Sequence, residues 1–273
     1  MTVMPPVSRT AIGVARVRAA EVRRSDPLFD DPYAAAFIRA SGIGSAATDS
    51  EAGTDDQRRW RAAIAFHISI RTRFFDDYLK AALGAGICQV VLLGAGLDAR
   101  AFRLEPSPAV RWFELDLPDV LMFKQEVLDE QQASPGCRRT ALAVDLGDDW
   151  ADDLTSAGFD ANAPTAWLAE GLLVYLDAAT AEHVLDVATS LSSPGSRLAV
   201  ERGDVARQIS VMPGDARPDA ASSLWRGGLG RNPANWLVEH GWQTEEHEVA
   251  DLATSYGRQA PPSARSGFVT ATR

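Results

Sequence analysis

The chain has 273 residues, 46% of them hydrophobic, which is enough for one large globular core without disulfide or metal staples. Its formal net charge is −10, from 37 acidic and 27 basic residues, and a surface of that sign repels phosphate backbones and disfavours a nucleic-acid substrate. The two cysteines, Cys88 and Cys137, lack metal-ligand spacing and are too few for a disulfide framework, so we expect structural thiols, no metal site and a cytoplasmic location.

The first segments of the chain read as helices and loops. Residues 1–6 show no apolar region of a secretion signal, and the longest apolar runs, such as Gln89–Gly96, are far too short to span a membrane. A local basic cluster is best explained as a solvated helix face; it consists of Arg16, Arg18, Arg23 and Arg24.

Three helices are expected in this N-terminal part. Ser8–Glu21 is the first, and Asp30-Asp31-Pro32 resembles a cap followed by a first-turn proline, which opens a helix through Ala40. Residues 41–57 are rich in Gly, Ser, Thr and Asp and form a loop. Arg58–Leu83 then carries an apolar stripe at helical spacing and predicts a long helix.

From residue 89 onward, short aliphatic runs alternate with helical stretches. The expected strands are Gln89–Leu93, Val110–Leu115, Arg139–Val144, Ala166–Leu168 and Arg197–Glu201. The expected helices are Ala99–Leu104, Leu117–Gln132, Trp150–Ala157 and Ala178–Leu191. This alternation predicts an α/β domain with a parallel sheet.

The last third departs from that rhythm. Asp204–His240 is rich in proline and glycine, and it is either a helical insertion that covers the sheet edge or an ordinary connecting pair of helices. Thr244–Ala250 and Phe268–Ala271 resemble two strands without a long helix between them, which predicts an antiparallel hairpin at the end of the sheet.

A glycine turn follows the first expected strand. Gly94 and Gly96 allow the backbone to approach a ligand closely, and the next helix would direct its N-terminal N–H groups at that ligand. No third glycine stands at the offset of the dinucleotide-binding fingerprint, so a pyrophosphate ligand is disfavoured.

Acidic residues stand at the ends of the following strands. Glu114 and Asp116 end the second strand about 20 residues after the glycines, where a carboxylate can accept both hydroxyls of a ribose. Asp145 ends the third strand and can accept a hydrogen bond from an exocyclic amine, and Glu170 ends the fourth. Ligands of open α/β sheets bind at the carboxyl ends of the strands, so these side chains should converge on one crevice.

Three segments now make the sequence recognisable. Gly94–Arg100, Phe113–Pro118 and Ala169–Leu176 closely resemble the leucine carboxyl methyltransferase family, and within it the bacterial, mycobacterial-type branch of S-adenosylmethionine-dependent methyltransferases. The likeness runs from about Arg9 to the C-terminus. Asp98 and Arg100, which follow the glycines, separate this family from most other methyltransferases.

The resemblance implies a class I methyltransferase with a Rossmann-like, seven-stranded sheet and a helical cover. One domain would then comprise an N-terminal cover with the cofactor helix (1–86), the cofactor-binding sheet (87–203), a helical insertion (204–240) and the C-terminal strands (241–273). The cofactor would be S-adenosyl-L-methionine, bound by Arg71, Gly94, Gly96, Asp98, Asp116, Asp145, Leu146 and Glu170.

Within that set the resemblance also implies individual roles. Arg71 would grip the cofactor carboxylate, with Arg73 as the alternative if the register differs, and Glu170 would lie near the amino group. The Gly94–Gly96 backbone would lie beside the methionine portion. Asp116 would bind the ribose hydroxyls, and the adenine would be held by Asp145 and Leu146.

The reaction type follows from the resemblance more directly than the acceptor does. We expect methyl transfer to an oxygen of a small molecule, and to a carboxylate, which is already ionised at pH 7 and needs no base, whereas a hydroxyl needs one. Of the four histidines only His67, one helical turn before Arg71, lies beside the motifs, and a structural role is its simpler interpretation. Tyr175 either contacts a substrate or packs in the core.

Two other functions compete with this hypothesis. An NAD-linked oxidoreductase would use the same kind of sheet, but it predicts a complete glycine fingerprint and a catalytic Tyr–Lys or His pair, and neither is evident. A non-catalytic module that binds S-adenosylmethionine would keep the same motifs without turnover.

Overall fold

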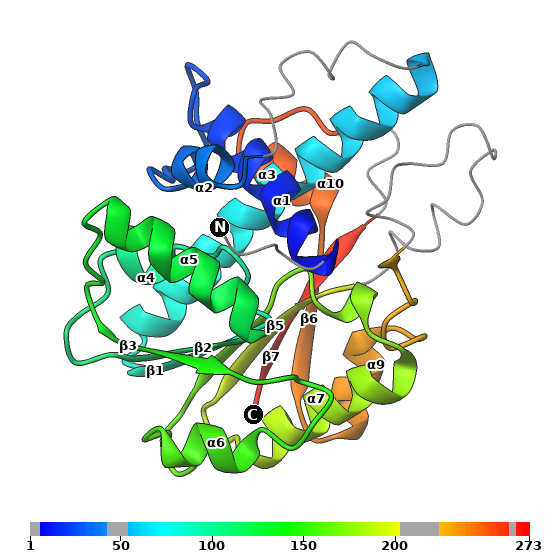
Figure 1. The fold of residues 1–273 in the computed structure, drawn as a ribbon. Coiled ribbons are helices and arrows are strands. Elements are labelled where there is room, and N and C mark those ends of the chain that lie inside the picture. Colours follow the sequence, from blue (N-terminus) through cyan, green and yellow to red (C-terminus); the bar gives the residue numbers. More distant parts are fainter. Residues whose placement is uncertain (1–5, 43–53, 203–223, 262–265) are drawn as a thin grey trace.

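Seven strands form a single sheet in the computed structural model, which describes residues 6–42, 54–202, 224–261 and 266–273 (Figure 1). The strand order is β3-β2-β1-β4-β5-β7-β6. The strands are β1 (Gln89–Leu93), β2 (Arg111–Asp116), β3 (Arg138–Ala143), β4 (Ala166–Ala169), β5 (Arg197–Glu201), β6 (Gln243–Glu248) and β7 (Gly267–Thr272). Strands β1 to β5 pair in parallel, and β7 runs antiparallel to both of its neighbours. The predicted α/β sheet is confirmed.

The sheet is covered on both faces, and successive strand residues point to opposite layers. Val90 and Leu92 face the layer of helices α1 to α5 and α10, whereas Val91 and Leu93 face α6, α7 and α9 (Figure 1). These helices are α1 (Pro6–Glu21), α2 (Ala34–Ala40), α3 (Asp55–Gly84), α4 (Arg100–Arg103), α5 (Pro118–Glu130), α6 (Ala151–Ser156), α7 (Ala178–Ser190), α9 (Pro233–Glu239) and α10 (Val249–Ser255). Burial on both faces explains why the central strands β1 and β4, whose residues are all buried, read as continuous apolar runs.

Helix α3 connects the N-terminal cover to the sheet. It begins three residues before the predicted start, because Thr54 and Gln57 form a capping box that satisfies the first backbone N–H groups. Its C-terminal half is buried, and the hydroxyl of Tyr78 donates to the backbone carbonyl of Trp167 at 3.0 Å. Helix α2 begins at Ala34, later than the start predicted at Asp31 and Pro32, and its N-cap is Tyr33. Asp31 Oδ1 nevertheless accepts from the backbone N–H groups of Tyr33 and Ala34, each at 3.1 Å.

The C-terminal part contains the predicted antiparallel pair in a different arrangement. β6 and β7 pair as expected, but β7 is inserted between β5 and β6, and the seven-residue helix α10 lies between them in sequence. Of the predicted insertion at 204–240, residues 204–223 lie outside the described residues; the remainder contains α9. Among the described helices, none has both the length and the apolar character needed to cross a bilayer.

Candidate functional site

A cavity of about 1910 Å³ opens at the carboxyl ends of the central strands. All eight predicted cofactor-binding residues line it, namely Arg71, Gly94, Gly96, Asp98, Asp116, Asp145, Leu146 and Glu170. They come from α3, from the turn after β1 and from the ends of β2, β3 and β4. The convergence expected from parallel topology is therefore observed.

The turn after β1 adopts a conformation that needs glycine. Gly94 has φ +66°, a backbone conformation that side chains rarely adopt, and a Cβ there would also lie 2.8 Å from the Cδ1 of Leu172, which would have to move. The backbone N–H of Gly96 donates to Asp116 Oδ2 at 2.6 Å, which ties the turn to the end of β2. The turn thus presents bare backbone to the cavity.

Only one of the two acidic residues at the end of β2 reaches the cavity. Asp116 lines the cavity. Burial raises the pKa of its carboxyl group, although the hydrogen bonds from the backbone N–H groups of Gly96 and Leu117 partly oppose that rise. Glu114 is fully buried and pairs with Lys124 and Arg139, each at 2.7 Å. Glu114 therefore has a structural role, and Asp116 is the candidate for ligand binding.

Asp145 and Leu146 follow β3 and line the cavity. Asp145 Oδ1 accepts from the backbone N–H of Gly147 at 2.9 Å, which fixes the turn and the direction of the carboxylate. Leu146 is buried and offers an apolar surface beside that carboxylate. A flat ring with an exocyclic amine is the kind of ligand that such a pair can bind.

Arg71 lies between two carboxylates. Its Nε donates to Glu170 Oε1 and its Nη1 to Glu201 Oε1, both at 2.9 Å. Burial opposes its charge, but the two glutamates outweigh that effect and raise the pKa of Arg71 above its ordinary value. Gly171, with φ +63°, leaves room for this guanidinium, since a Cβ there would lie 3.0 Å from its Nη1.

Arg73, the alternative in the other register, lies elsewhere. Its side chain is over one-third exposed, pairs with Asp77 along α3, and is absent from the described cavity lining. The sequence reasoning missed Glu201, which ends β5 just as Glu170 ends β4. The rule that located Glu170 would have located Glu201 if it had been applied to one more strand.

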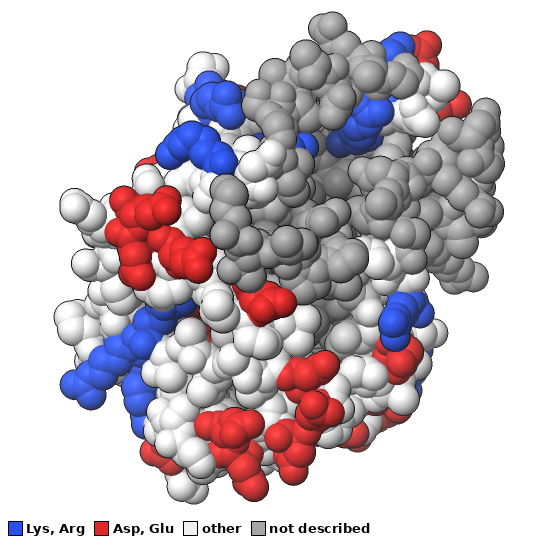
Figure 2. All heavy atoms as spheres, viewed as in Figure 1, with Lys and Arg blue, Asp and Glu red and all other residues white. Residues whose placement is uncertain are grey.

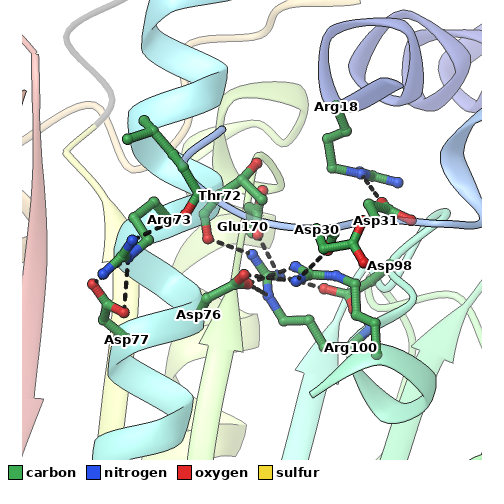
Figure 3. A network of polar contacts seen from close by, with 12 residues as sticks. Arg18, Asp30, Asp31, Thr72, Arg73, Asp76, Asp77, Asp98, Arg100 and Glu170 are labelled. Atoms are coloured by element: carbon green, nitrogen blue, oxygen red, sulfur yellow. Dashed lines mark hydrogen bonds and ion pairs between the residues drawn. The ribbon is translucent and has the colours of Figure 1, made fainter. Parts of the chain in front are cut away.

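Behind these carboxylates lies a buried arginine, Arg100 (Figure 3). Its Nη1 contacts both Asp98 and Glu170, the latter at 2.6 Å, and its Nε donates to Asp76 at 2.6 Å. Its Nη2 donates to the backbone carbonyl of Thr72 at 3.2 Å. Burial is the largest single influence and raises the pKa of Asp98, but the charges of Arg100, Lys124 and Arg103 and the backbone N–H of Arg100 together outweigh it and lower the pKa to about 2. Arg100 holds the cavity-facing carboxylates from behind.

This network carries one excess negative charge, with histidine counted as neutral. Four carboxylates, on Asp76, Asp98, Glu170 and Glu201, are matched by three guanidinium groups, on Arg71, Arg100 and Arg103. Of the four carboxylates in this network, those of Asp98, Glu170 and Glu201 line the cavity, and their side chains are 12%, 14% and 17% exposed. A ligand that brings one ammonium group would neutralise this wall.

One histidine belongs to the cavity wall. His67 Nε2 lies 3.0 Å from Glu201 Oε1, and its Nδ1 lies 2.9 Å from Ser266 Oγ. Tyr175 also lines the cavity, whereas the other three histidines are absent from its described lining. Among the described residues no group of side chains is suited to hold a metal ion, and Cys88 and Cys137 are free thiols.

Comparisons with known proteins agree with this geometry. The family model for leucine carboxyl methyltransferase matches residues 11–189. A candidate S-adenosyl-L-methionine-dependent methyltransferase of Parafrankia sp. is 46% identical, covering 98% of this chain and 87% of its own. A second, from Mycobacteroides abscessus, is 40% identical over 99% of this chain and 97% of its own.

Solved structures show the same fold at low identity. A DUF574 family protein from Streptomyces avermitilis has a TM-score of 0.55 at 18% identity, covering 95% of this chain and 96% of its own. A candidate methyltransferase from Thermobifida fusca has a TM-score of 0.54 at 15% identity, covering 95% and 94%. The strand order with an antiparallel β7 is that of class I methyltransferases. The chain thus belongs to the leucine carboxyl methyltransferase family and is an S-adenosylmethionine-dependent methyltransferase.

Proposed function

We propose that the enzyme methylates an oxygen atom of a small molecule, and that this oxygen belongs to a carboxylate. The observation that carries the proposal is the separation of charge along the cavity. Its inner end holds the carboxylates of the strand ends, whereas α1, the residues after it, α3 and the segment after α10 contribute five arginines, Arg16, Arg18, Arg24, Arg61 and Arg258. Of these, Arg18 pairs with Asp31, and Arg24 and Arg258 pair with Glu21 and Asp26, so that among the acids of these segments only Glu21 itself is part of the described lining. An arginine-bearing wall in a chain of net charge −10 favours an anionic acceptor.

Figure 2 shows acidic side chains around α6 and α7 in the lower part of the visible face and a further acidic patch over α5, with basic side chains near the N-terminal helices at the top and also at the lower left.

The inner end of the cavity fits the cofactor. For its zwitterionic amino-acid end we assign Arg71 to the carboxylate and Glu170, with Asp98 beside it, to the ammonium group. We assign the ribose hydroxyls to Asp116, whose oxygens each accept one backbone N–H and retain a lone pair for a hydroxyl.

The remaining assignments follow the cavity wall. Asp145 and Leu146 would hold the adenine, and the backbone at Gly94 and Gly96 would lie beside the methionine portion. We also propose that the chain works as one domain, with residues 1–86 as cover and cofactor helix, 87–203 as cofactor-binding sheet, 204–240 as an insertion and 241–273 as the closing strands.

The chain's part in the reaction is mainly positioning. When bound, S-adenosylmethionine supplies an electrophilic methyl group on a sulfonium. The wall must align an acceptor oxygen with that methyl group and exclude water. Trp60, Phe66 and Trp225 line the cavity and offer apolar surface for the body of the acceptor. A carboxylate arrives ionised, so its transfer requires no proton acceptor from the chain.

Calorimetry and product analysis test the proposal together. Asp116→Ala should weaken S-adenosylmethionine binding by about 1.5–3 kcal/mol, because it removes charge-assisted hydrogen bonds. Asp129→Ala, an exposed carboxylate on α5, is the matched control and should leave the dissociation constant unchanged. A panel of small carboxylic acids should yield methyl esters and S-adenosylhomocysteine. Unchanged binding by Asp116→Ala contradicts the site assignment, and methylation confined to nitrogen acceptors contradicts the proposed acceptor.

A further inference from the structure

The cavity wall contains a row of three polar side chains that have no role in the proposed binding of the cofactor. Glu201, His67 and Ser266 are joined by contacts of 3.0 Å and 2.9 Å, and all three line the cavity. They come from β5, α3 and the residue before β7, so that His67 is separated from its partners by 134 and 199 positions in sequence. The fold brings them together at one point.

The chemistry of Glu201 decides which ring nitrogen of His67 carries the proton. Burial by itself raises the pKa of Glu201, but Arg71 and His67 outweigh it and lower the pKa to about 2. An ionised carboxylate only accepts hydrogen bonds, so Nε2 of His67 is the protonated nitrogen. Nδ1 then keeps its lone pair and accepts the hydrogen bond of the Ser266 hydroxyl.

Glu201, His67 and Ser266 stand in the order expected for a general base whose imidazole ring is held in one orientation. A carboxylate fixes one face of the imidazole, and the other nitrogen is left to take a proton from a hydroxyl. Phe268 packs against the ring, with centroids 5.6 Å apart, and further restricts its orientation. His183 and His240 instead contact backbone carbonyl groups, and His247 contacts Thr270, away from the described cavity lining.

The chain of groups also lies next to the proposed cofactor site. Glu201 Oε1 accepts from both His67 and Arg71, so one carboxylate joins the base to the residue assigned to the cofactor carboxylate. An acceptor that reaches the cofactor from the side of Ser266 would therefore contact the Ser266 hydroxyl, which is hydrogen-bonded to Nδ1 of His67.

We propose that His67, acting through Ser266, is a general base that extends the acceptors of this enzyme from carboxylates to neutral hydroxyl groups. The inference rests on the proposed oxygen methylation. The acceptor O–H bond breaks, and its proton passes to the oxygen of Ser266 while the proton of Ser266 passes to Nδ1 of His67. The oxygen electron pair forms the bond to the methyl carbon as the carbon–sulfur bond breaks, and that pair stays on sulfur. The products are a methyl ether, S-adenosylhomocysteine and a protonated His67 held by Glu201, which then releases its proton to solvent.

Acceptors that carry both a carboxylate and a hydroxyl group test the proposal, because the ester product serves as the internal reference for the ether product. Hydroxybenzoic acids and hydroxylated fatty acids are incubated with the enzyme and S-adenosylmethionine, and ester and ether products are separated by mass spectrometry. The wild type should form both products, and His67→Gln should lower the ratio of ether to ester by about 10²–10⁴-fold, the usual contribution of a general base. Ser266→Ala should lower the ratio in the same direction, and His247→Gln, which alters a histidine outside the described lining, should leave it unchanged.

Two results would overturn the inference. One is an ether-to-ester ratio that His67→Gln leaves unchanged, or a wild type that forms esters without any ether. The other comes from nitrogen-15 NMR of the histidine rings, which should report the Nε2–H tautomer for His67 in the protein with S-adenosylhomocysteine; the Nδ1–H tautomer excludes the relay. A panel that gives neither product counts against the proposed oxygen methylation, and the tautomer still decides the arrangement of His67.

Discussion

The two ends of the cavity are built in different ways. At the inner end, Asp98, Asp116 and Glu170 project from the ends of neighbouring parallel strands or the turn beside them, and each accepts hydrogen bonds that fix its direction. At the outer end, the lining comes from α1, α3 and loops, and Arg61 and Trp60 lie on the more exposed first half of α3. The inner end is a pre-organised site, whereas the outer end is a surface formed by the packing of a helical cover.

The difference has a physical reason. Parallel strands in register bring their carboxyl ends to the same edge, so a residue at a strand end is positioned by the whole sheet. A residue on the first turns of α3 is positioned only by that helix, and α3 is buried mainly from Ile68 onward. We therefore expect substitutions at the inner end to alter stability and cofactor binding, and those at the outer end to alter acceptor use.

The largest effect should follow from removal of Arg100. Arg100→Gln leaves Asp76, Asp98 and Glu170 without their shared guanidinium, and breaking a buried ion-pair cluster costs about 3–5 kcal/mol in the free energy of unfolding. Denaturant unfolding measures this change. Arg231→Gln is the matched control, because Arg231 pairs on the surface with Glu239 and its loss should cost less than about 0.5 kcal/mol. Equal losses of unfolding free energy in Arg100→Gln and Arg231→Gln would contradict the view that the inner end of the cavity is a pre-organised part of the core.

If the Arg100→Gln variant remains folded, its relative affinity for two cofactor-derived ligands tests whether Arg100 orients the inner end of the cavity. Affinity for S-adenosylhomocysteine should fall more than affinity for 5′-methylthioadenosine, which lacks the amino-acid end. Arg100→Lys should restore part of the difference, because it restores the charge. Equal losses for the two ligands would mean that Arg100 supports the fold without orienting Glu170.

A smaller effect is expected from acid. The pKa values of Asp98 and Glu201 are about 2 in the folded protein, below their ordinary values of 3.8 and 4.5. The folded state is therefore harder to protonate than the unfolded state, so this stabilisation is complete above about pH 5 and is lost as the pH falls from there toward 2. Thermal unfolding between pH 6 and 3 should show the loss, and Glu201→Gln should make the decline shallower. A parallel decline in both proteins would contradict the role given to Glu201.

The smallest effect on stability should come from the outer wall. Arg61→Gln replaces an exposed side chain, so the unfolding free energy should stay within about 0.5 kcal/mol of the wild-type value. The dissociation constant for S-adenosylmethionine should also be unchanged. The KM for a carboxylate acceptor should rise, and the rise should shrink in high salt, because exposed charges are screened. A raised dissociation constant for the cofactor would show that the two ends are not separate.

Much of the fold and of the inner site could be predicted because it depends on local pattern. The aliphatic runs within Gln89–Leu93 and Arg197–Glu201 coincide with β1 and β5, since strands covered on both faces are rich in buried apolar residues. Every residue of β1 is buried, and so are the three central residues of β5. The glycines at 94 and 96 and the acids at 116, 145 and 170 stand at strand ends, where topology predicts a shared crevice. The structure places all of them on one cavity.

The outcomes that sequence left open depend on contacts between distant segments. Whether Arg71 or Arg73 faces the cavity is a matter of how α3 rotates against the sheet, and two residues on a helix point about 200° apart. The insertion of β7 between β5 and β6 follows from pairing along the whole strand, which adjacent sequence does not reveal.

Sequence by itself thus determined the fold class, the glycine turn and the acidic strand ends, because hydrophobic periodicity and the residues that end a strand are local features of the chain. Tertiary structure alone decided that Arg100 supports Glu170 from behind, and that His67 lies between Glu201 and Ser266. Those contacts join residues that are 70 to 199 positions apart. A buried charge takes its partners from whichever segments the packed core brings within hydrogen-bonding distance, and no local pattern records that choice.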